Sequence, residues 1–295
     1  MHTLYNDKLS NLNNDETGMM PSFPTMSSAW YRHRQKTIPV LPQTRSEVDL
    51  QDSWTQTADG RPFLLFADGD DDKILAFGSL ESLEALQSSE ILYMGGTFTA
   101  CPGLWNQVYI IHARLGATTY PLIFALLPDR QTDTYSRLFM LLKDEVQQRL
   151  NRPLAPSCIQ TDFEMAAIRA VQVVFPTADV KGCFFLYCQA IWRKVQHLGL
   201  AVAYREDPEV CKWIRRAAGL PLLPKNKIQD TWVDAMDNTP DVPRAVAFND
   251  YILTTWVDHG ARFPLPLWNH HSTTGPRMNN NLEGFHNRLN RGLPH

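Results

Sequence analysis

Two acidic residues stand where they could hold a metal ion. Asp162 ends "SCIQTDF", an apolar segment that predicts a short strand, and Glu283 lies in "NNNLEGFH", within a predicted helix near the end of the chain. Carboxylate oxygens are the ligands that hard cations such as Mg²⁺ prefer. Each residue also has a simpler interpretation, because Asp162 could cap the helix that begins near Glu164, and Glu283 could be a surface glutamate.

A polar and basic strip surrounds Glu283 in the same segment. Its members have side chains suited to phosphate contacts, and they are Arg277, Asn279, Asn280, Asn287, Arg288 and Arg291. Arg193 and Lys194 are two further cations that could face DNA, whereas the neighbouring Trp192 is expected in the core. A solvated helix face explains such a strip equally well.

Three other groups of possible metal ligands are weaker. The acidic run Asp68–Asp72 lacks the ligand spacing of an EF-hand and predicts a solvated turn. Cys183 and Cys188 have no second pair at zinc-finger spacing, which favours buried structural thiols. His270 and His271 are adjacent in a predicted loop, where solvated side chains are expected.

The predicted elements around these residues follow a definite order. Two strands, Phe63–Phe66 and Ile74–Phe77, form a hairpin around an Asp/Gly turn, and a helix begins near Leu80. Three strands with short linkers then predict an antiparallel meander, over Ile91–Phe98, Gln107–Leu115 and Tyr120–Leu127. The rest alternates as helix, strand, helix, strand and helix, in "TDTYSRLFMLLKDEVQQRL", "SCIQTDF", "EMAAIRAVQVVFP", "ADVKGCFF" and "LYCQAIWRKVQHLG".

Composition divides the chain into five parts. Residues 1–28 predict a disordered leader, and residues 29–90 an N-terminal α+β extension packed on the core, which opens with an extended segment in "SAWYRHRQKTIPVLPQT". Residues 91–199 form the predicted core. Residues 200–268 predict several helices around tryptophans, and residues 269–295 a C-terminal helix that stops abruptly, as though truncated.

This order predicts an α/β protein with an RNase H-like mixed sheet: three antiparallel strands, then βαβα, with an all-helical insertion before the last helix. In that fold the metal-binding carboxylates lie at the ends of the first and fourth strands and on a late helix. Asp162 and Glu283 fit the second and third positions. The first strand ends in "MGGTF", where Gly95 and Gly96 offer no carboxylate, although adjacent glycines often mark a close backbone approach.

Several ordered segments resemble the catalytic domain of Mutator-like element (MULE) transposases: "MGGTF", "YPLIFALLP", "TDFEMAAI", "VFPTADVKGCFFLYCQAIWRKVQ" and "RMNNNLEGFHNRLN". The resemblance runs from about Trp30 to the end of the chain. It implies an RNase H-like fold whose helical insertion corresponds to residues 200–268. It also implies DNA cleavage and strand transfer by a DDE triad with two Mg²⁺ (or Mn²⁺) ions, which clamp both sides of the displacement.

One position of the triad departs from the family. By the family's "DGTF" motif, the first aspartate would stand at Gly95, the second at Asp162 and the third at Glu283. Glycine coordinates nothing. The preceding carboxylate, Glu90, is about 16 Å away along an extended strand, and the next one after Gly95 is Asp129.

A second departure lies just past the fifth core strand. The family commonly has Cys-x-x-His there, and this chain has Cys183 followed by Leu186 at the histidine position. Whatever that pair does in active relatives, Leu186 cannot do it.

These departures predict a transposase domain that is catalytically impaired, with Asp162 and Glu283 holding metal weakly or not at all. A decayed copy that no longer cuts DNA, or a recruited DNA-binding or protein-interaction module, is favoured over an enzyme with residual nuclease activity. The resemblance implies transposon-end DNA as the partner and a nuclear location. A homodimer is a further expectation, and neither a membrane nor a small-molecule substrate is expected.

The composition fits this view. No run of about 18 apolar residues predicts a membrane helix, the N-terminus lacks the apolar core of a secretory signal, and five cysteines suit a reducing compartment. A net charge of −3 indicates no dedicated basic module. Residues 1–90 contain no cysteine, so the zinc-binding DNA-recognition module common in the family is not expected there.

Overall fold

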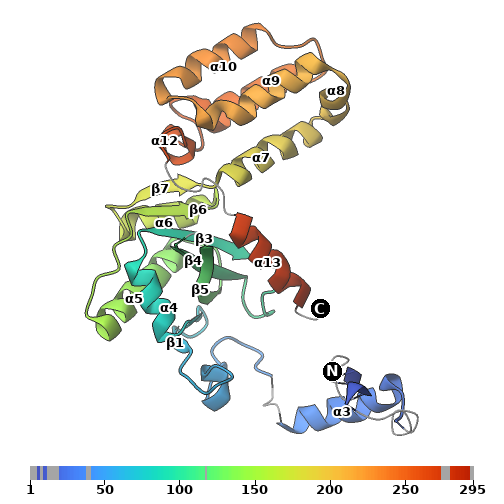
Figure 1. Cartoon of the computed structure of the whole chain (residues 1–295), viewed down its shortest axis with the longest axis vertical. Helices are drawn as coiled ribbons and strands as arrows, with labels where there is room; N and C mark the ends of the chain where they lie inside the picture. The colour runs from blue at the N-terminus through green and yellow to red at the C-terminus, as the bar shows by residue number, and fades with distance from the viewer. Residues whose placement is uncertain are drawn as a thin grey trace.

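A seven-stranded mixed sheet forms the centre of the molecule (Figure 1). The computed structural model describes residues 5–6, 9–11, 20–37, 41–116, 118–273 and 280–292. The strands lie across the sheet in the order β1-β2-β5-β4-β3-β6-β7. In chain order, β1 to β7 span Leu64–Asp68, Ile74–Phe77, Ile91–Thr97, Gln107–Leu115, Thr118–Leu127, Cys158–Thr161 and Asp179–Gly182.

The sheet has an antiparallel part and a parallel part that meet at β3. Strands β1, β2, β5, β4 and β3 pair antiparallel, whereas β6 pairs parallel with β3 and β7 pairs parallel with β6. The prediction of an α/β fold with a mixed sheet is therefore confirmed. The predicted hairpin is also present, and it extends the same sheet because β2 pairs with β5.

Helices cover both faces of this sheet. Figure 1 shows α4 (Leu80–Ser88), α5 (Thr132–Leu150) and α6 (Met165–Val174) on one side and α13 (Asn280–Gly292) on the other. Side chains alternate between the faces of a strand. Leu92 and Met94 of β3 join the apolar core under α5 and α6. Gly95, one residue on from Met94, therefore belongs to the face that α13 covers.

Helix α5 shows how the sequence pattern produces this packing. The buried stripe is the predicted one, formed by Tyr135, Leu138, Phe139, Leu142 and Val146. The start of the helix differs from the prediction, because the cap position is Gln131 rather than Thr132 or Asp133. The Asp129 carboxylate orders this turn by accepting hydrogen bonds from the Gln131 amide at 3.0 Å and the Thr134 hydroxyl at 2.6 Å.

A second group of helices stands at the β7 edge of the sheet (Figure 1). Helix α7 (Phe184–His197) leads into it from the sheet, and Gly199 lies just past its end with φ +73°. Trp213, Trp232 and Trp256, around which several helices were predicted, lie in its apolar core. The elements that follow α7 are α8 (Ala201–Glu206), α9 (Pro208–Gly219), α10 (Ile228–Asp237), α11 (Ala245–Ile252), a π-helical turn (Leu253–Val257) and α12 (Leu265–Trp268), with short 3-10 turns at Leu220–Leu222 and Lys225–Lys227.

The prediction for the N-terminal region is wrong in one respect. Helix α3 covers Phe23–Thr37, where an extended segment was expected, and it crosses the proposed boundary at residue 28. Pro24 lies in the first turn of the helix, where proline is tolerated, and the stretch that follows has no proline before Pro39. A 3-10 turn, Asp52–Thr55, precedes β1.

In the part of the chain that the structure describes, no helix has the length and apolar character needed to cross a lipid bilayer.

Gly96 is required by close packing within the sheet. A Cβ built at this position would lie 2.2 Å from Oε1 of Gln107. Gln107 is fully buried, and its Nε2 donates a hydrogen bond to the hydroxyl of Tyr135. The amide therefore cannot move aside without giving up a buried hydrogen bond.

We expect Gly96→Ala to lower the free energy of unfolding by about 1–3 kcal/mol, the usual cost of overpacking a core. Gly103→Ala is the matched control, because a Cβ there meets nothing within 4 Å. Denaturant unfolding of both variants checks this. Equal stability of the two variants would contradict the packing described for Gly96.

Candidate active site

The pairing of β3 with β6 brings the first two predicted site positions together. The parallel register aligns Leu92 with Ile159 and Met94 with Thr161. Continued by one residue, the same register sets Gly95 opposite Asp162, which directly follows β6. Neighbouring strands lie about 4.8 Å apart. Two positions that are distant in the sequence are therefore adjacent at one end of the sheet.

Asp162 lies between the end of β6 and the start of α6. The residue at the helix cap is Glu164, not Asp162, and its side chain makes no capping hydrogen bond. Glu164 instead pairs with Arg130 at 2.9 Å. The N-terminus of α6 carries a partial positive charge, which favours carboxylates in this turn. The simpler interpretation of Asp162 as the helix cap is therefore not what the structure has.

The Asp162 carboxylate also acts on a buried phenol nearby. Burial is the main cause that raises the pKa of Tyr109 well above its usual value, and the charges of Tyr135 and Asp162 raise it further. The rings of Tyr109 and Tyr135 meet edge to face at 5.1 Å. Burial raises the pKa of Tyr135 as well, so both phenols stay protonated and can serve as hydrogen-bond donors but not as bases.

Phe163 fixes the backbone next to Asp162. Its ring meets Trp256 at 5.0 Å and Phe263 at 5.1 Å, both edge to face. Both residues belong to the second group of helices, residues 200–268, which we call the helical region. The same ring lies against β7, where a Cβ on Gly182 would approach it to 2.4 Å. The helical region therefore packs against Phe163, the residue directly after Asp162.

Helix α13 carries Glu283 and lies against β3, β4 and β5. The Thr97 hydroxyl at the end of β3 donates to Oδ1 of Asn290 at 3.1 Å. Phe285 meets His112 of β4 at 5.7 Å and Phe124 of β5 at 5.9 Å. Glu283 is part of this helix, and its side chain lies outside the described part of the structure. The helix with the third predicted carboxylate therefore lies on the sheet face to which Gly95 belongs.

The predicted DNA-binding residues fall into three groups. Arg288 is an exposed side chain on α13. The side chains of Asn280 and Asn287 on that helix, and the whole of Arg277 and Asn279, lie outside the described residues.

Arg193 and Lys194 lie about nine residues along α7, on the order of 14 Å from its first residue. Arg193 is exposed, and the Lys194 ammonium lies over the ring of Tyr251 at 5.1 Å. The prediction that Trp192 lies in the core is wrong, because its side chain is 37% exposed. It lies one position off the buried stripe of α7, which is formed by Tyr187, Ile191 and Val195.

The burial and hydrogen bonds of the cysteines and histidines considered as zinc ligands indicate structural roles. Cys183 is buried, and burial raises the pKa of the Cys188 thiol to about 11. His270 was expected in solvent but is buried, because its Nε2 donates to the Gly182 carbonyl at 2.8 Å and closes the end of β7. His271 is exposed as expected. Over the described ranges, no three His, Cys, Asp or Glu side chains gather as a metal site.

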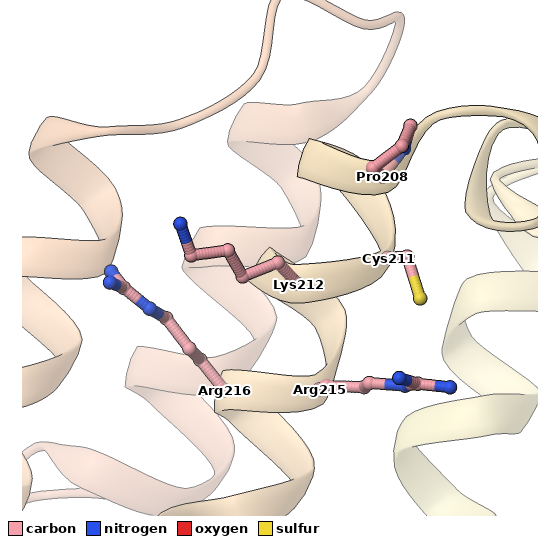
Figure 2. Close-up of a pocket in the computed structure, with 5 residues that line it drawn as sticks. All are labelled: Pro208, Cys211, Lys212, Arg215 and Arg216. Carbon is pink, nitrogen blue, oxygen red and sulfur yellow. The ribbon is translucent and has the colours of Figure 1, made fainter.

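The sequence analysis did not single out a basic hollow on α9. Figure 2 shows Lys212 and Arg216 directed to one side of this helix and Cys211 and Arg215 to the other. The hollow measures about 500 Å³ and is far from Asp162 along the chain. Two of its cations already have partners within the helical region. Arg216 pairs with Asp234 at 3.0 Å, and Arg215 donates to the Tyr204 hydroxyl at 3.3 Å.

Comparison with protein families gives a match to part of the chain. The family model of the MULE transposase domain matches residues 106–190, from just before β4 to within α7. Asp162 lies inside this match, whereas Gly95 and Glu283 lie outside it. No curated protein matches the chain. Over residues 106–190, the chain is therefore similar to the MULE transposase domain.

Proposed function

We propose that this chain is a MULE-type DNA transposase domain that binds DNA but is impaired in cutting it. The observation that supports this proposal is the parallel register of β3 and β6, whose last pair, Met94 with Thr161, immediately precedes Gly95 and Asp162. A family site built on carboxylates would need one at each of these two positions. This chain supplies only one of them.

The core strands support an RNase H-like assignment. Their order across the sheet is β5-β4-β3-β6-β7, with three antiparallel strands followed by two parallel ones. The helices α8 to α12 come between α7 and α13, where the family has its insertion. We accordingly divide the chain into a core over residues 91–199, an insertion over 200–268, and a final segment over 269–295.

The chain's own residues do not supply a complete two-metal ligand set. Asp162 stands at the site, and Glu283 is on the helix packed against β3, but Gly95 has no side chain. The nearby Glu164 is engaged with Arg130. The family's divalent cation would supply charge stabilisation at the cleaved phosphate, and this chain has lost a ligand position on which such binding depends.

The same vacancy favours a second candidate, a non-catalytic DNA-binding or protein-interaction module. The sheet keeps its regular pairing at this position, because Gly95 lies within β3 opposite Ile110 of β4. A domain that keeps its fold while lacking one ligand could still hold DNA.

We expect the unmodified chain to leave supercoiled plasmid intact in Mg²⁺ or Mn²⁺, and Gly95→Asp to nick it. Strand backbone accepts any L-residue, so aspartate can occupy the position without backbone strain. The gain should be at least about tenfold, or roughly 1.4 kcal/mol in barrier height. Gly95→Asn is the matched control, since it has nearly the same shape and no charge. Metal-dependent nicking by the unmodified chain would overturn the proposed impairment.

Metal binding gives an independent check. In the Gly95→Asp background, calorimetry with Mn²⁺ should show binding that is lost when Asp162→Asn is added, because both carboxylates would face one ion. Asp133→Asn is the control, as Asp133 is an exposed residue in the first turn of α5. Binding that survives Asp162→Asn would show that Asp162 is not a ligand.

A further inference from the structure

A second hollow lies between α13 and the strands β4 and β5. It measures about 310 Å³, and its lining includes His112, Thr118, Thr119, Gly284, Phe285 and Arg288. A water molecule takes about 30 Å³ of liquid volume, so a phosphate group fits with room to spare. None of the lining residues, all within the described part of the chain, is acidic.

His112 is a buried polar side chain at the inner wall of this hollow. It is 1% exposed, and no described residue makes a hydrogen bond of normal geometry with either ring nitrogen, although the Ile110 backbone is near enough to act on the His112 pKa in the direction opposite to burial. Its ring lies between Phe285 at 5.7 Å and His286 at 6.2 Å. A buried donor without a partner costs about 1–3 kcal/mol. Such a group in a native structure calls for a ligand or an ordered water.

The protonation state of His112 makes it a neutral donor. Burial, with a smaller effect from His286, lowers the pKa of His112 to about 3. A neutral imidazole carries one N–H and one free lone pair. The N–H can therefore be given to an oxygen that enters the hollow.

The rim adds hydrogen-bond donors and positive charge. Arg288 is exposed on α13, and Thr118 and Thr119 bring hydroxyl groups from the start of β5. Arg114 lies two residues after His112, on the same face of β4, and its Nε donates to the Gly116 carbonyl at 2.9 Å. A metal cation would meet these arginines with no carboxylate among the lining residues. The set of groups suits an anion.

We propose that this hollow binds a phosphate of the DNA backbone, with Arg288 and His112 as its main contacts. The inference rests on the proposed function for the identity of the ligand, since DNA is the partner of the family. It concerns a site on β4 and β5, separate from the positions of Gly95 and Asp162. Arginine and histidine donors to phosphate fix the register of DNA on a protein without reading its sequence.

The DNA affinity of two variants of the hollow, Arg288→Gln and His112→Phe, and of one control variant tests this inference. The probe is a short fluorescent duplex of mixed sequence, titrated with the full chain at several salt concentrations. Arg288→Gln should weaken binding about tenfold, the scale of one charge-assisted hydrogen bond. It should also reduce the salt slope by about 1. Arg169→Gln, at an exposed position of α6 on the opposite face of the sheet, should change neither.

His112→Phe separates a binding role from a structural one. Phenylalanine keeps the ring contacts and removes the unpartnered nitrogens, so the melting temperature should stay equal or rise, while DNA affinity falls. DNA affinity unchanged in both His112→Phe and Arg288→Gln would overturn the inference and leave the proposed function standing. If His112→Phe does not fold, the exposed Arg288→Gln alone decides.

The source of the phosphate is resolved by following the His112 ring signals in NMR. Inorganic phosphate and the duplex are added separately to the full chain. Shifts with the duplex support the inference as stated. Shifts with inorganic phosphate, in a chain that binds no duplex, would identify a free-phosphate site and overturn both the DNA assignment and the proposed function. No shift with either overturns the site itself.

Discussion

The parallel pairing of β3 with β6 is the constraint on which the rest of the structure depends. It joins the antiparallel half of the sheet to the βαβ half, and its last pair, Met94 with Thr161, immediately precedes Gly95 and Asp162. Both faces of β3 are covered, with α5 and α6 on one side and α13 on the other. A shift of one residue would move Met94 out of the core and place Gly95 in it. Burial thus fixes the register, and the register fixes which two positions meet at the end of the sheet.

The aromatic cluster around Phe163 packs the helical region against the β6 and β7 edge of the sheet. Tyr187 of α7 stacks on Trp268 at 5.4 Å and meets Trp256 edge to face at 4.6 Å. The Lys181 ammonium on β7 donates to the Pro266 carbonyl at 2.8 Å. Aromatic pairs of this kind add about 0.5–1.5 kcal/mol each beyond their buried area. The helices after α7 therefore hold the end of β6 in place instead of forming an independent unit.

Local patterns in the sequence were sufficient for most of the elements. Alternating and helical spacing located the strands of the sheet, and the stripe of α5 was identified residue by residue. The strand-end glycines also carried usable information, since Gly96 meets Gln107 as a close approach would require. These features depend on neighbours within a few residues, or on the period of one element.

The errors come from contacts between distant segments. His270 is buried because it meets a carbonyl of β7, and Trp192 is exposed because it stands one position off a buried stripe. His112 was overlooked for the same reason. In the sequence it is a single polar residue in an apolar strand, and its significance appears only when α13 packs over it. No local pattern identifies such partners.

The adjacent glycines of β3 separate what the fold requires from what the chemistry requires. At Gly96 a side chain would collide with a buried amide, so packing alone explains the glycine. At Gly95 the strand is regular, and its conformation gives no reason for glycine. Packing therefore explains glycine at position 96, whereas the strand conformation alone does not call for glycine at position 95. Under the proposed function, the absence of a first carboxylate leaves β3 paired with β4 and with β6, so the sheet does not depend on that group.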